Sequence, residues 1–372
     1  EAECVIDAAG MWGREIAAMV GTRVAVGAVE HQYFVSEKSA TKIPTGLPSL
    51  RDPDANFYVK PEPGALAVGG WESNTRPWGA AGIPIDFGPE LLQPDYDRFE
   101  PLGTAAIARI PVLGEIGIRQ MINGPIPITA DGEPVIGLSP ELDNFYLCCG
   151  FTSGIAASGG AGWVMANWIV DGDPGLDLWP FDVRRFGAPH SVKETLYERA
   201  VESYGRYYQI AWPGHENETA RGARRSPLYD TLKRQGAVYG NKFGWERPNW
   251  FAPEGTPALD TPTFERGPAF AAIAAEHRAV RERVALIDMS SFSKYEVRGP
   301  GALALLQKVA VNDLDKPDGS IVYTQLCNPR GGIEADVTIT RLAADRFYFV
   351  TGSALGVRDR STIERHLPGD GS

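Results

Sequence analysis

The run CCGFTSGIAASGGAGW, residues 148–163, constrains the fold of this chain more than any other segment. It follows NFYL, in which three large hydrophobic residues succeed an asparagine, and leads into WVMANWI, so the pattern predicts a strand, a glycine turn and a helix. A helix N-terminus after such a turn offers N–H groups and partial positive charge to an anion, and glycines allow close backbone approach. A phosphate loop, a tightly packed helix and flexible filler are the three interpretations. The spacing differs from G-x-G-x-x-G and does not support a pyrophosphate loop.

Hydrophobic periodicity predicts the elements before this run. We expect a strand, the turn AAG and a helix from residue 1, extended segments over 24–37 and 56–72, a helix over 86–110, and a hairpin at the D-G of PIPITADGEPVIGL. The turn PEPG at 61–64 predicts that segment 56–72 also folds as a hairpin.

After the run, residues 171–190 are rich in Pro, Gly and Asp and predict a linker or domain edge. We then expect helices over 268–285 and 300–310 and strands over 293–298, 320–328, 333–341 and 346–352. The first of these helices would carry one apolar face, formed by Phe270, Ile273, His277, Val280 and Val284.

Length and charge exclude several classes of protein. A chain of 372 residues predicts two or three domains, and a net charge of −11 argues against nucleic acid or an anionic membrane as partner. No apolar stretch approaches the roughly 20 residues that span a bilayer. The histidines show no metal-ligand spacing, so we expect no metal site. Reduced, mostly buried thiols in an intracellular compartment are expected for Cys4, Cys148, Cys149 and Cys327.

Nearly the whole chain resembles one protein family in collinear order. The matching blocks are VIDAAGMWGREIAAMVG, VEHQYFVSE, LRDPDANFYVKPEPGALAVGGWE, NGPIPITADGEPVIG, CGFTSGIAASGGAGWVMANWI, RRSPLYDTLKRQGAVYGNKFGWERPNWF, IDMSSFSKYEVRGPGA and GGIEADVTITRL. They are similar to the dimethylglycine/sarcosine dehydrogenase family, in which an FAD-dependent amine oxidoreductase of the D-amino-acid-oxidase type is joined to a folate-binding, aminomethyltransferase-like domain. GAVYGNKFGWERPNWF, which joins the two halves, is the most specific block.

The resemblance implies a mixed α+β and α/β fold class. Residues 1–186 would form the substrate and flavin-edge part of the FAD domain, with a large mixed sheet. Residues 187–262 would connect it to an α+β folate-binding domain over 263–372. Both ends predict truncation, because family members carry an N-terminal βαβ unit, a flavin-linking histidine in several cases, and a longer folate domain. No targeting segment is visible, and the expected location is a bacterial cytoplasm or the mitochondrial matrix.

The resemblance also implies where FAD would lie. The flavin contacts would be Trp12 and the turn Gly150, Phe151, Thr152, Ser153, Gly154 and Ile155. This agrees with the helix N-terminus predicted above, because reduced flavin carries negative charge around N1 and the C2 carbonyl. Related amine oxidases can place a lysine in this helix. Ala156 and Ala157 supply no cation, so a substrate carboxylate needs another partner.

Two residues match an amine site. His31 corresponds to a family histidine beside the substrate amine, and Tyr58 to an active-site tyrosine. Hydride leaves an N-methyl carbon only when the nitrogen lone pair is free, so a nearby His or Tyr would lower the pKa of the amine or take its proton. The alternatives are a core histidine between Val29, Tyr33 and Val35, and an ordinary sheet tyrosine.

The folate half depends mainly on GGIEADVTI. Alternation places Ile333, Ala335, Val337 and Ile339 on one strand face and Glu334, Asp336, Thr338 and Thr340 on the other. By resemblance, Asp336 would lie near folate N5/N10, with Tyr323 on the neighbouring strand; a solvated polar face is the alternative. Arg221, Arg224 and Arg225 form either an anion site for a polyglutamylated folate or a solvated basic turn.

The predicted activity is oxidative N-demethylation of dimethylglycine or sarcosine by hydride transfer to FAD. The one-carbon unit would pass to tetrahydrofolate as 5,10-methylenetetrahydrofolate. Electron-transfer flavoprotein or oxygen would accept the electrons. The alternatives are a catalytically silent relative, similar to the regulatory subunit of pyruvate dehydrogenase phosphatase, and a folate-dependent aminomethyltransferase or demethylase.

Overall fold

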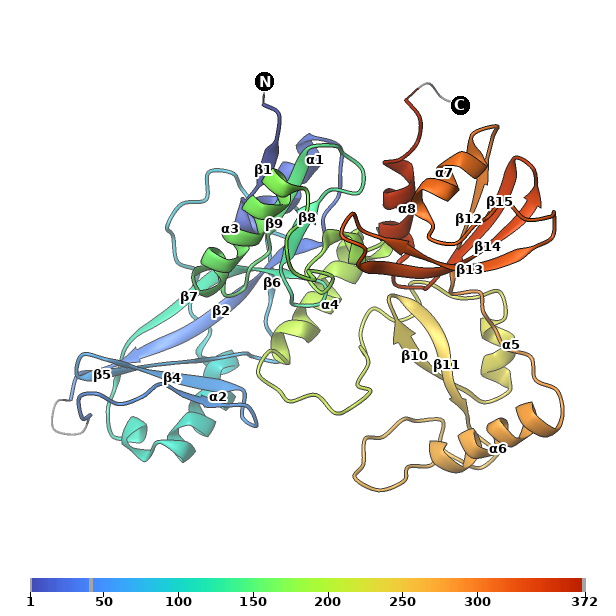
Figure 1. The fold of residues 1–372 in the computed structure, drawn as a ribbon. Helices are drawn as coiled ribbons and strands as arrows, with labels where there is room; N and C mark the ends of the chain where they lie inside the picture. Colours follow the sequence, from blue (N-terminus) through green and yellow to red (C-terminus); the bar gives the residue numbers. More distant parts are fainter. Residues whose placement is uncertain (1, 40–42, 370–372) are drawn as a thin grey trace. The chain divides into compact units, whose positions relative to one another are not determined.

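A computed structural model describes residues 2–39 and 43–369 (Figure 1). Glu1 of the predicted first strand and the last three residues of the predicted C-terminal end, HLPGDGS, lie outside these ranges. The chain forms two compact units: Glu1–Val183 with His190–Ala220, and Arg184–Pro189 with Arg221–Ser372. The three-domain division proposed from the sequence remains a prediction.

A six-stranded antiparallel sheet forms the centre of the first unit. Its strands are β3 (Leu50–Asp52), β4 (Phe57–Glu62), β5 (Ala65–Gly70), β2 (Val26–Ser36), β6 (Pro77–Trp78) and β7 (Ile118–Thr129). Strand β2 pairs with β7 along its whole length and with β5 and β6 on its other edge. The predicted extended segments 24–37 and 56–72 are therefore strands, and the second is the expected hairpin.

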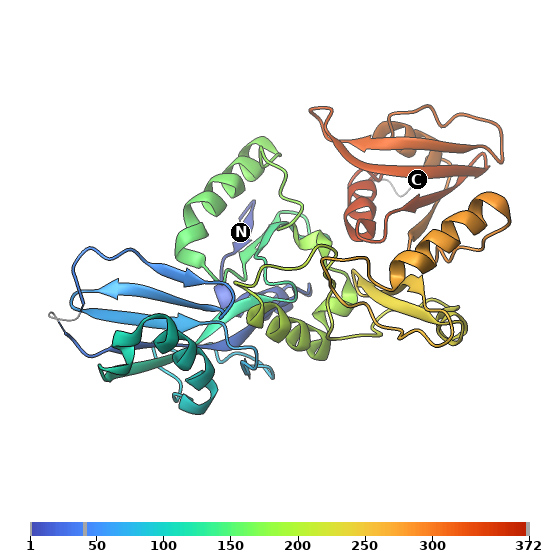
Figure 2. The same cartoon turned by 90° about the horizontal axis from the view of Figure 1, so that it is seen from below.

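The two faces of this sheet differ in how well they are covered. Helix α2 (Tyr96–Arg109) packs on one face (Figures 1 and 2), and its N-cap Asp95 accepts a hydrogen bond from the Arg98 N–H. The shared core contains Phe34, Phe57, Val59, Val68, Phe99, Leu102 and Met121. The opposite face carries the half-buried Tyr33, Tyr58 and Ile122. We call this second face the open face.

Helix α2 is shorter than the segment predicted to be helical. The sequence indicated a helix over 86–110, but residues 86–95 are not helical. Pro89 and Pro94 lie in this stretch, and proline disfavours the helical conformation of the residue before it. The helix begins after Asp95, where the first side-chain cap becomes available.

A small sheet of three strands lies beside the large one. Its members are β1 (Val5–Asp7), β9 (Phe145–Cys149) and β8 (Val135–Leu138), and β1 runs parallel to β9. The 3-10 helix Gly10–Trp12 and α1 (Gly13–Met19) follow β1, and α3 (Gly154–Asp171) follows β9. The carboxyl ends of two adjacent parallel strands meet at one sheet edge, so turns 8–10 and 150–153 are neighbours.

The hairpin predicted at Asp131-Gly132 is wrong. Strand β7, before the turn, pairs with β2 of the large sheet, whereas β8, after it, pairs with β9 of the small sheet. Thr129 donates a hydrogen bond to Asp131, and the Glu133 N–H also donates to Asp131. The local turn chemistry was therefore recognised correctly, but the turn transfers the chain between two sheets.

A helix that comes after the small sheet and α3 in the chain covers one end of the open face. Helix α4 (Lys193–Gly205) packs Ala200 and Tyr204 against Val29, Trp71 and Ile128. Buried Asn56 holds the end of this helix to the sheet, because its side-chain amide donates to the carbonyls of Trp71 (2.5 Å) and Gly205 (2.7 Å). Asn56 has φ +60°, which an asparagine tolerates.

The second unit contains two sheets. The hairpin β10 (Ala237–Lys242) and β11 (Trp245–Phe251) follows α5 (Tyr229–Arg234), and the larger sheet has the order β12 (Ser293–Arg298), β15 (Arg346–Thr351), β14 (Ile333–Ala343), β13 (Ile321–Cys327). Helices α7 (Ala302–Val309) and α8 (Gly356–Glu364) contribute to its core. All the elements predicted over 293–352 are present. On the strand face predicted from alternation, Ala335, Val337 and Ile339 are buried and Ile333 is exposed.

Helix α6 (Ala269–Glu282) forms where a helix was predicted, but its apolar face is not buried. Phe270 and Val280 are about half exposed, and Val284 lies beyond the helix end. Amphipathic periodicity therefore predicted the helix correctly, and the structure leaves its apolar face exposed.

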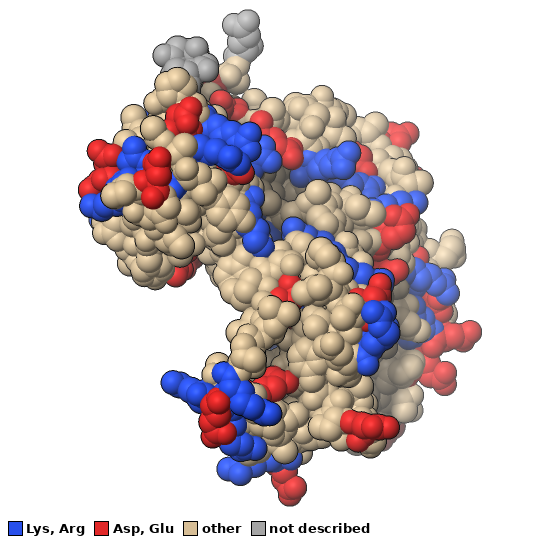
Figure 3. Space-filling view, turned by 90° about the vertical axis from the view of Figure 1, so that its right-hand side faces the viewer, with Lys and Arg blue, Asp and Glu red and all other residues tan. Residues whose placement is uncertain are grey.

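Charged side chains of both signs lie on the surface of the protein (Figure 3). On the face shown in Figure 3, Lys and Arg side chains are mixed with Asp and Glu, and the described residues of that face form no continuous basic surface. No described helix has the length and hydropathy that a membrane span requires. All four cysteines are free, but only Cys149 is fully buried, contrary to the expectation of mostly buried thiols.

Candidate active site

The open face brings a histidine and several aromatic rings together. His31 Nδ1 lies 2.8 Å from the Tyr204 hydroxyl of α4, and His31 Nε2 lies 3.4 Å from the Tyr58 hydroxyl of β4. The Trp71 ring lies 5.1 Å from the imidazole, measured between centroids. The two residues proposed from the sequence as the amine site are therefore neighbours.

Glycines make room for this arrangement. In the sheet register Tyr58 is opposite Gly69, and Gly69 is opposite Tyr33. A Cβ at Gly69 would overlap the ring and hydroxyl of Tyr58, so the absence of a side chain lets Tyr58 extend across β5 towards His31.

A second glycine lies directly opposite His31. Gly124 of β7 is the register partner of His31, and a Cβ at Gly124 would meet nothing within 4 Å. Its φ is not in the left-handed region, so its backbone accepts other residues. The face beside His31 therefore has room for a small molecule.

The imidazole is held neutral. Burial lowers the pKa of His31 from 6.5 to about 4. Burial also raises the pKa of the Tyr58 hydroxyl, with smaller contributions from Tyr208 and Tyr33. At neutral pH His31 is uncharged and Tyr58 keeps its proton, so both can exchange hydrogen bonds with an amine without adding charge.

Tyr204 can fix the tautomer of this histidine. Tyr204 is fully buried, and its hydroxyl lies 3.5 Å from the Gly70 carbonyl as well as 2.8 Å from His31 Nδ1. When the hydroxyl donates to that carbonyl, it accepts the Nδ1–H of His31. The lone pair of Nε2 then faces Tyr58 and the open side of the sheet.

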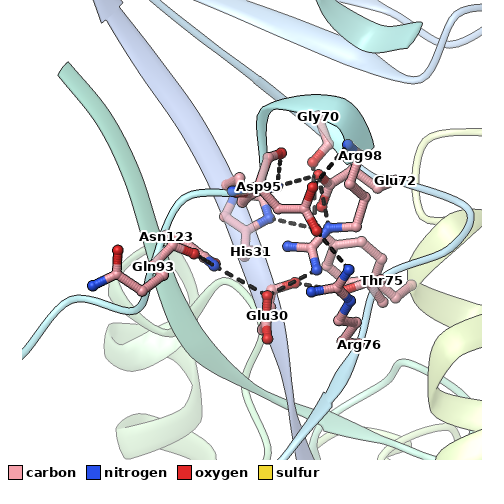
Figure 4. Close-up of polar contacts among 12 residues, drawn as sticks. Glu30, His31, Gly70, Glu72, Thr75, Arg76, Gln93, Asp95, Arg98 and Asn123 are labelled. Carbon is pink, nitrogen blue, oxygen red and sulfur yellow. Dashed lines mark hydrogen bonds and ion pairs between the residues drawn. The ribbon is translucent and has the colours of Figure 1, made fainter. Parts of the chain in front are cut away.

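The carboxylates of this region lie on the other side of the sheet. Figure 4 shows Arg98 between Glu30 and Glu72, with contacts of 2.8 Å and 3.2 Å. Gln32 also donates to Glu72, over 2.6 Å. Glu30 and Gln32 alternate with His31 along β2, so they point to the face that α2 covers. Among the described residues no carboxylate forms a hydrogen bond or ion pair with His31.

The glycine turn after β9 has the form that the sequence predicts. Gly150 has φ +74°, and a Cβ there would come within 2.9 Å of Thr129 Cγ2 and 3.1 Å of Val26 Cγ2. Both the backbone conformation and the lack of space require glycine. Ser153 is the N-cap of α3 but makes no side-chain hydrogen bond to the helix, which leaves the first N–H groups available to another acceptor.

One side of α3 is open. Ile155 is 99% exposed, and Cβ atoms at Gly159, Gly160 and Gly162 would meet nothing within 4 Å. A pocket of about 380 Å³ with mainly apolar lining lies against the same turn. Its walls include Gly132, Pro134, Phe151, Thr152, Ser153, Ala157, Gly160 and Tyr207. An open glycine surface beside a helix N-terminus fits the flat, electron-rich edge of a flavin.

Trp12, the other proposed flavin contact, lies at the neighbouring turn after β1. Its indole N–H donates to the Pro84 carbonyl over 2.9 Å, and its ring packs near Met11, Ala28 and Ile83. These contacts hold Trp12 in place, and its contact with the flavin remains a prediction.

Aromatic contacts connect the glycine turn after β9 to the residues around His31 on the open face. The Tyr207 hydroxyl lies 3.4 Å from Ser153 Oγ, and the Tyr207 ring packs 4.1 Å from Trp71 between centroids. Trp71 in turn contacts His31. A chain of contacts within the first unit thus joins Ser153, a proposed flavin residue, to His31, a proposed substrate residue.

The proposed folate residues are also neighbours. The Tyr323 hydroxyl donates to Asp336 Oδ2 over 3.0 Å, and both side chains lie on the exposed face of the β13–β14 pair. The basic turn that contains Arg221, Arg224 and Arg225 is engaged internally. Arg221 pairs with Glu246 at 2.5 Å, whereas Arg224 and Arg225 lie over the rings of Trp245 and Tyr229.

Sequence reasoning missed several residues of the amine site: Trp71, Gly124, Tyr204, Tyr207 and Tyr208. A signal for Tyr204 was present, since Leu196, Ala200 and Tyr204 recur at intervals of four and indicate a buried helix face. No local pattern indicates that this face packs beside His31, which is 173 residues away.

Comparison with known families agrees with this architecture. The model of FAD dependent oxidoreductases matches residues 1–168, the FAD dependent oxidoreductase central domain matches 171–226, and the GCVT N-terminal domain matches 228–371. The chain therefore combines a D-amino-acid-oxidase-type FAD domain with an aminomethyltransferase-like domain, which confirms the predicted fold class.

Curated relatives narrow the family. The chain is 38% identical over 366 residues to 4-methylaminobutanoate oxidase (formaldehyde-forming) of Paenarthrobacter nicotinovorans. It is 34% identical over 405 residues to mouse mitochondrial sarcosine dehydrogenase, and 33% over 368 residues to mouse mitochondrial dimethylglycine dehydrogenase. These alignments cover 97%, 98% and 97% of the chain but only 44%, 43% and 42% of the relatives. The chain belongs to the dimethylglycine/sarcosine dehydrogenase family, as its sequence motifs predicted.

The lowered pKa of His31 gives a testable prediction. Because the folded-state pKa of about 4 is below the ordinary 6.5, protonation opposes folding. The contribution of His31 to stability is thus complete above pH 6.5 and is lost as the pH falls towards 4. In an NMR titration of labelled histidines, assigned with His31→Gln, the His31 ring should stay neutral down to about pH 5. A midpoint near 6.5 would contradict the buried, neutral site.

Proposed function

We propose that the protein oxidises an N-methylated amino acid at the open face and transfers the released one-carbon unit to tetrahydrofolate. The observation that carries the first part is the pairing of neutral His31 with Tyr58 beside Gly124, on a face connected to the glycine turn at 150–154. Sarcosine, dimethylglycine and 4-methylaminobutanoate are the candidate substrates, by analogy with the names of the relatives.

The residues of the open face would prepare the amine for oxidation. The nitrogen must lose its proton before its N-methyl carbon can be oxidised. An ammonium ion beside His31 would find no carboxylate partner there, because Glu30 and Glu72 are bound to Arg98 on the buried face. Desolvation without a counter-charge lowers the pKa of an amine. His31 Nε2 and the Tyr58 hydroxyl would then hold the neutral amine by hydrogen bonds.

The low pKa of His31 changes the role that the sequence suggested for this residue. A histidine with a pKa of about 4 is a poor permanent acceptor for the proton of an amine. We therefore assign His31 and Tyr58 to orienting and neutralising the amine, with the proton leaving to solvent.

FAD would be held by the residues that fit it, namely the N–H groups at the start of α3 and the glycine turn. When bound, FAD supplies the acceptor for the hydride that leaves the N-methyl carbon. Residues Gly150 and Ser153–Ile155 would contribute backbone N–H groups and the helix dipole at the edge where negative charge develops. The final electron acceptor, electron-transfer flavoprotein or oxygen, remains a prediction.

The second unit would capture the product carbon. An iminium released by amine oxidation reacts with a nucleophilic nitrogen, and the N5 and N10 atoms of tetrahydrofolate are such nucleophiles. The Asp336 carboxylate, which accepts a hydrogen bond from Tyr323, would orient the folate or take its proton. The GCVT match over 228–371 supports a folate-related role for this unit.

The amine oxidation can be tested by flavin bleaching. The FAD-loaded protein, expressed from its complete reading frame, should lose its yellow absorbance anaerobically with at least one of the three substrates. Gly124→Leu should reduce kcat/KM about 100-fold, because its side chain would enter the substrate position and an ångström of displacement can cost this much. Gly124→Ala is the matched control and should have a much smaller effect.

Thermal melting should show that both Gly124 variants fold, since nothing lies within 4 Å of the added Cβ. A wild-type flavoprotein that none of the substrates bleaches would refute the oxidoreductase proposal and favour the catalytically silent alternative. Equal activity of folded Gly124→Leu and wild type would exclude this face as the site.

The folate role has a separate readout. Asp336→Asn should leave flavin bleaching unchanged but reduce 5,10-methylenetetrahydrofolate formation about 10- to 100-fold, with formaldehyde released in its place. Glu334→Gln, a neighbouring exposed carboxylate on the same strand, is the control and should retain folate product. Unchanged folate product in Asp336→Asn would remove Asp336 from the proposed mechanism.

A further inference from the structure

The proposed substrates carry a carboxylate, and the helix that follows the flavin turn supplies no cation for it. Ala156 and Ala157 occupy its first turn, and no acidic or basic residue lies in its first or last turn apart from the terminal Asp171. A buried or half-buried carboxylate without a cationic or N–H partner is unfavourable. A cation on one of the other described elements that form the open face would supply this partner.

The sheet register places a cation beside Tyr58. Arg51 of β3 is directly opposite Tyr58 of β4, and residues opposite one another in an antiparallel pair project to the same face. Arg51 thus belongs to the open face, in the row that continues through Tyr58 and Gly69 to Tyr33. Lys60 also lies on this face, but its ammonium is 2.9 Å from Glu62.

The Arg51 guanidinium is held in place without being neutralised. Its Cζ lies 4.1 Å from the centroid of the Tyr208 ring, and that ring contacts both Tyr58 (6.3 Å) and Trp71 (5.5 Å). Stacking on an aromatic ring orients a guanidinium while leaving its N–H donors available. Among the described residues, no carboxylate forms an ion pair with Arg51.

The Tyr208 ring, on which Arg51 stacks, belongs to a residue that is held by hydrogen bonds of its own. The backbone N–H of Tyr208 donates to the Asn56 side chain over 3.3 Å, and the amide of the same Asn56 holds the carbonyls of Trp71 and Gly205. Asn56 is buried. Arg51 itself is exposed, but the Tyr208 ring on which its guanidinium stacks is held by this buried hydrogen-bond network.

We propose that Arg51 binds the carboxylate of the N-methyl amino acid and selects amino acids over uncharged amines. The inference rests on the proposed amine site at His31 and Tyr58. The planar guanidinium suits two parallel hydrogen bonds to a carboxylate. A positive charge at this end of the site also disfavours an ammonium at the other end, which supports release of the amine proton.

Kinetics of the FAD-loaded, complete protein test this role. For the amino acid that bleaches the wild type, Arg51→Ala should lower kcat/KM about 10- to 100-fold, mainly through KM. For the matching N-methylalkylamine, which lacks the carboxylate, the variant should be no worse than wild type. Lys60→Ala, the ion-paired cation of the same face, should behave as wild type. An equal loss for both kinds of substrate would overturn the proposal.

A binding measurement keeps the inference testable if no amine is oxidised. Trimethylglycine and its four-carbon homologue, 4-(trimethylammonio)butanoate, carry the carboxylate but have no nitrogen lone pair to oxidise. Calorimetry should show that Arg51→Ala raises the Kd of the better ligand about 10-fold or more, whereas Lys60→Ala does not. Binding that is unaffected by Arg51→Ala, or absent from a folded wild type, would refute Arg51 as the carboxylate site. If no substrate bleaches the flavin but binding still depends on Arg51, only the proposed oxidation would be refuted.

Discussion

The unequal covering of the central sheet is the constraint on which the rest of the first unit depends. Helix α2 fills one face with apolar side chains and with Arg98, which neutralises Glu30 and Glu72. Removing one member of such a buried pair generally costs about 3–5 kcal/mol, because the remaining charge has no partner. Glu30 and Glu72 are therefore fixed on the buried face, whereas the described residues of the open face include neutral His31, tyrosines, the Lys60–Glu62 ion pair and Arg51.

This separation explains why the open face suits amine chemistry. Hydrogen-bonding groups without negative charge favour a neutral amine, and Gly69 and Gly124 provide the space that side chains would otherwise fill. Helix α4 and the residues that follow it complete the site, since Tyr204 contacts His31, Tyr207 contacts Ser153 and Tyr208 supports Arg51. A segment outside the FAD domain match thus shapes the site that the domain carries.

The sequence predicted those features whose causes are local. The glycine turn at residue 150 and the alternation along β14 both follow from local residue types, and the structure contains both. Pairing between distant strands has no local signature, and the turn at Asp131-Gly132 was therefore mistaken for a hairpin. The proximity of His31 and Tyr58 came from family resemblance. Tyr204 and Arg51 emerged only once the sheet register and the docking of α4 were known.

A crystal structure of the FAD-loaded protein with trimethylglycine or its four-carbon homologue tests the central claim most directly. We expect the ligand to lie over Gly124, with its methyl groups beside His31 and Tyr58 and its carboxylate on Arg51. The flavin should present its pyrimidine edge to the N–H groups of residues 153–155. A ligand bound away from the open face, or a flavin whose pyrimidine edge faces another part of the chain, would contradict it.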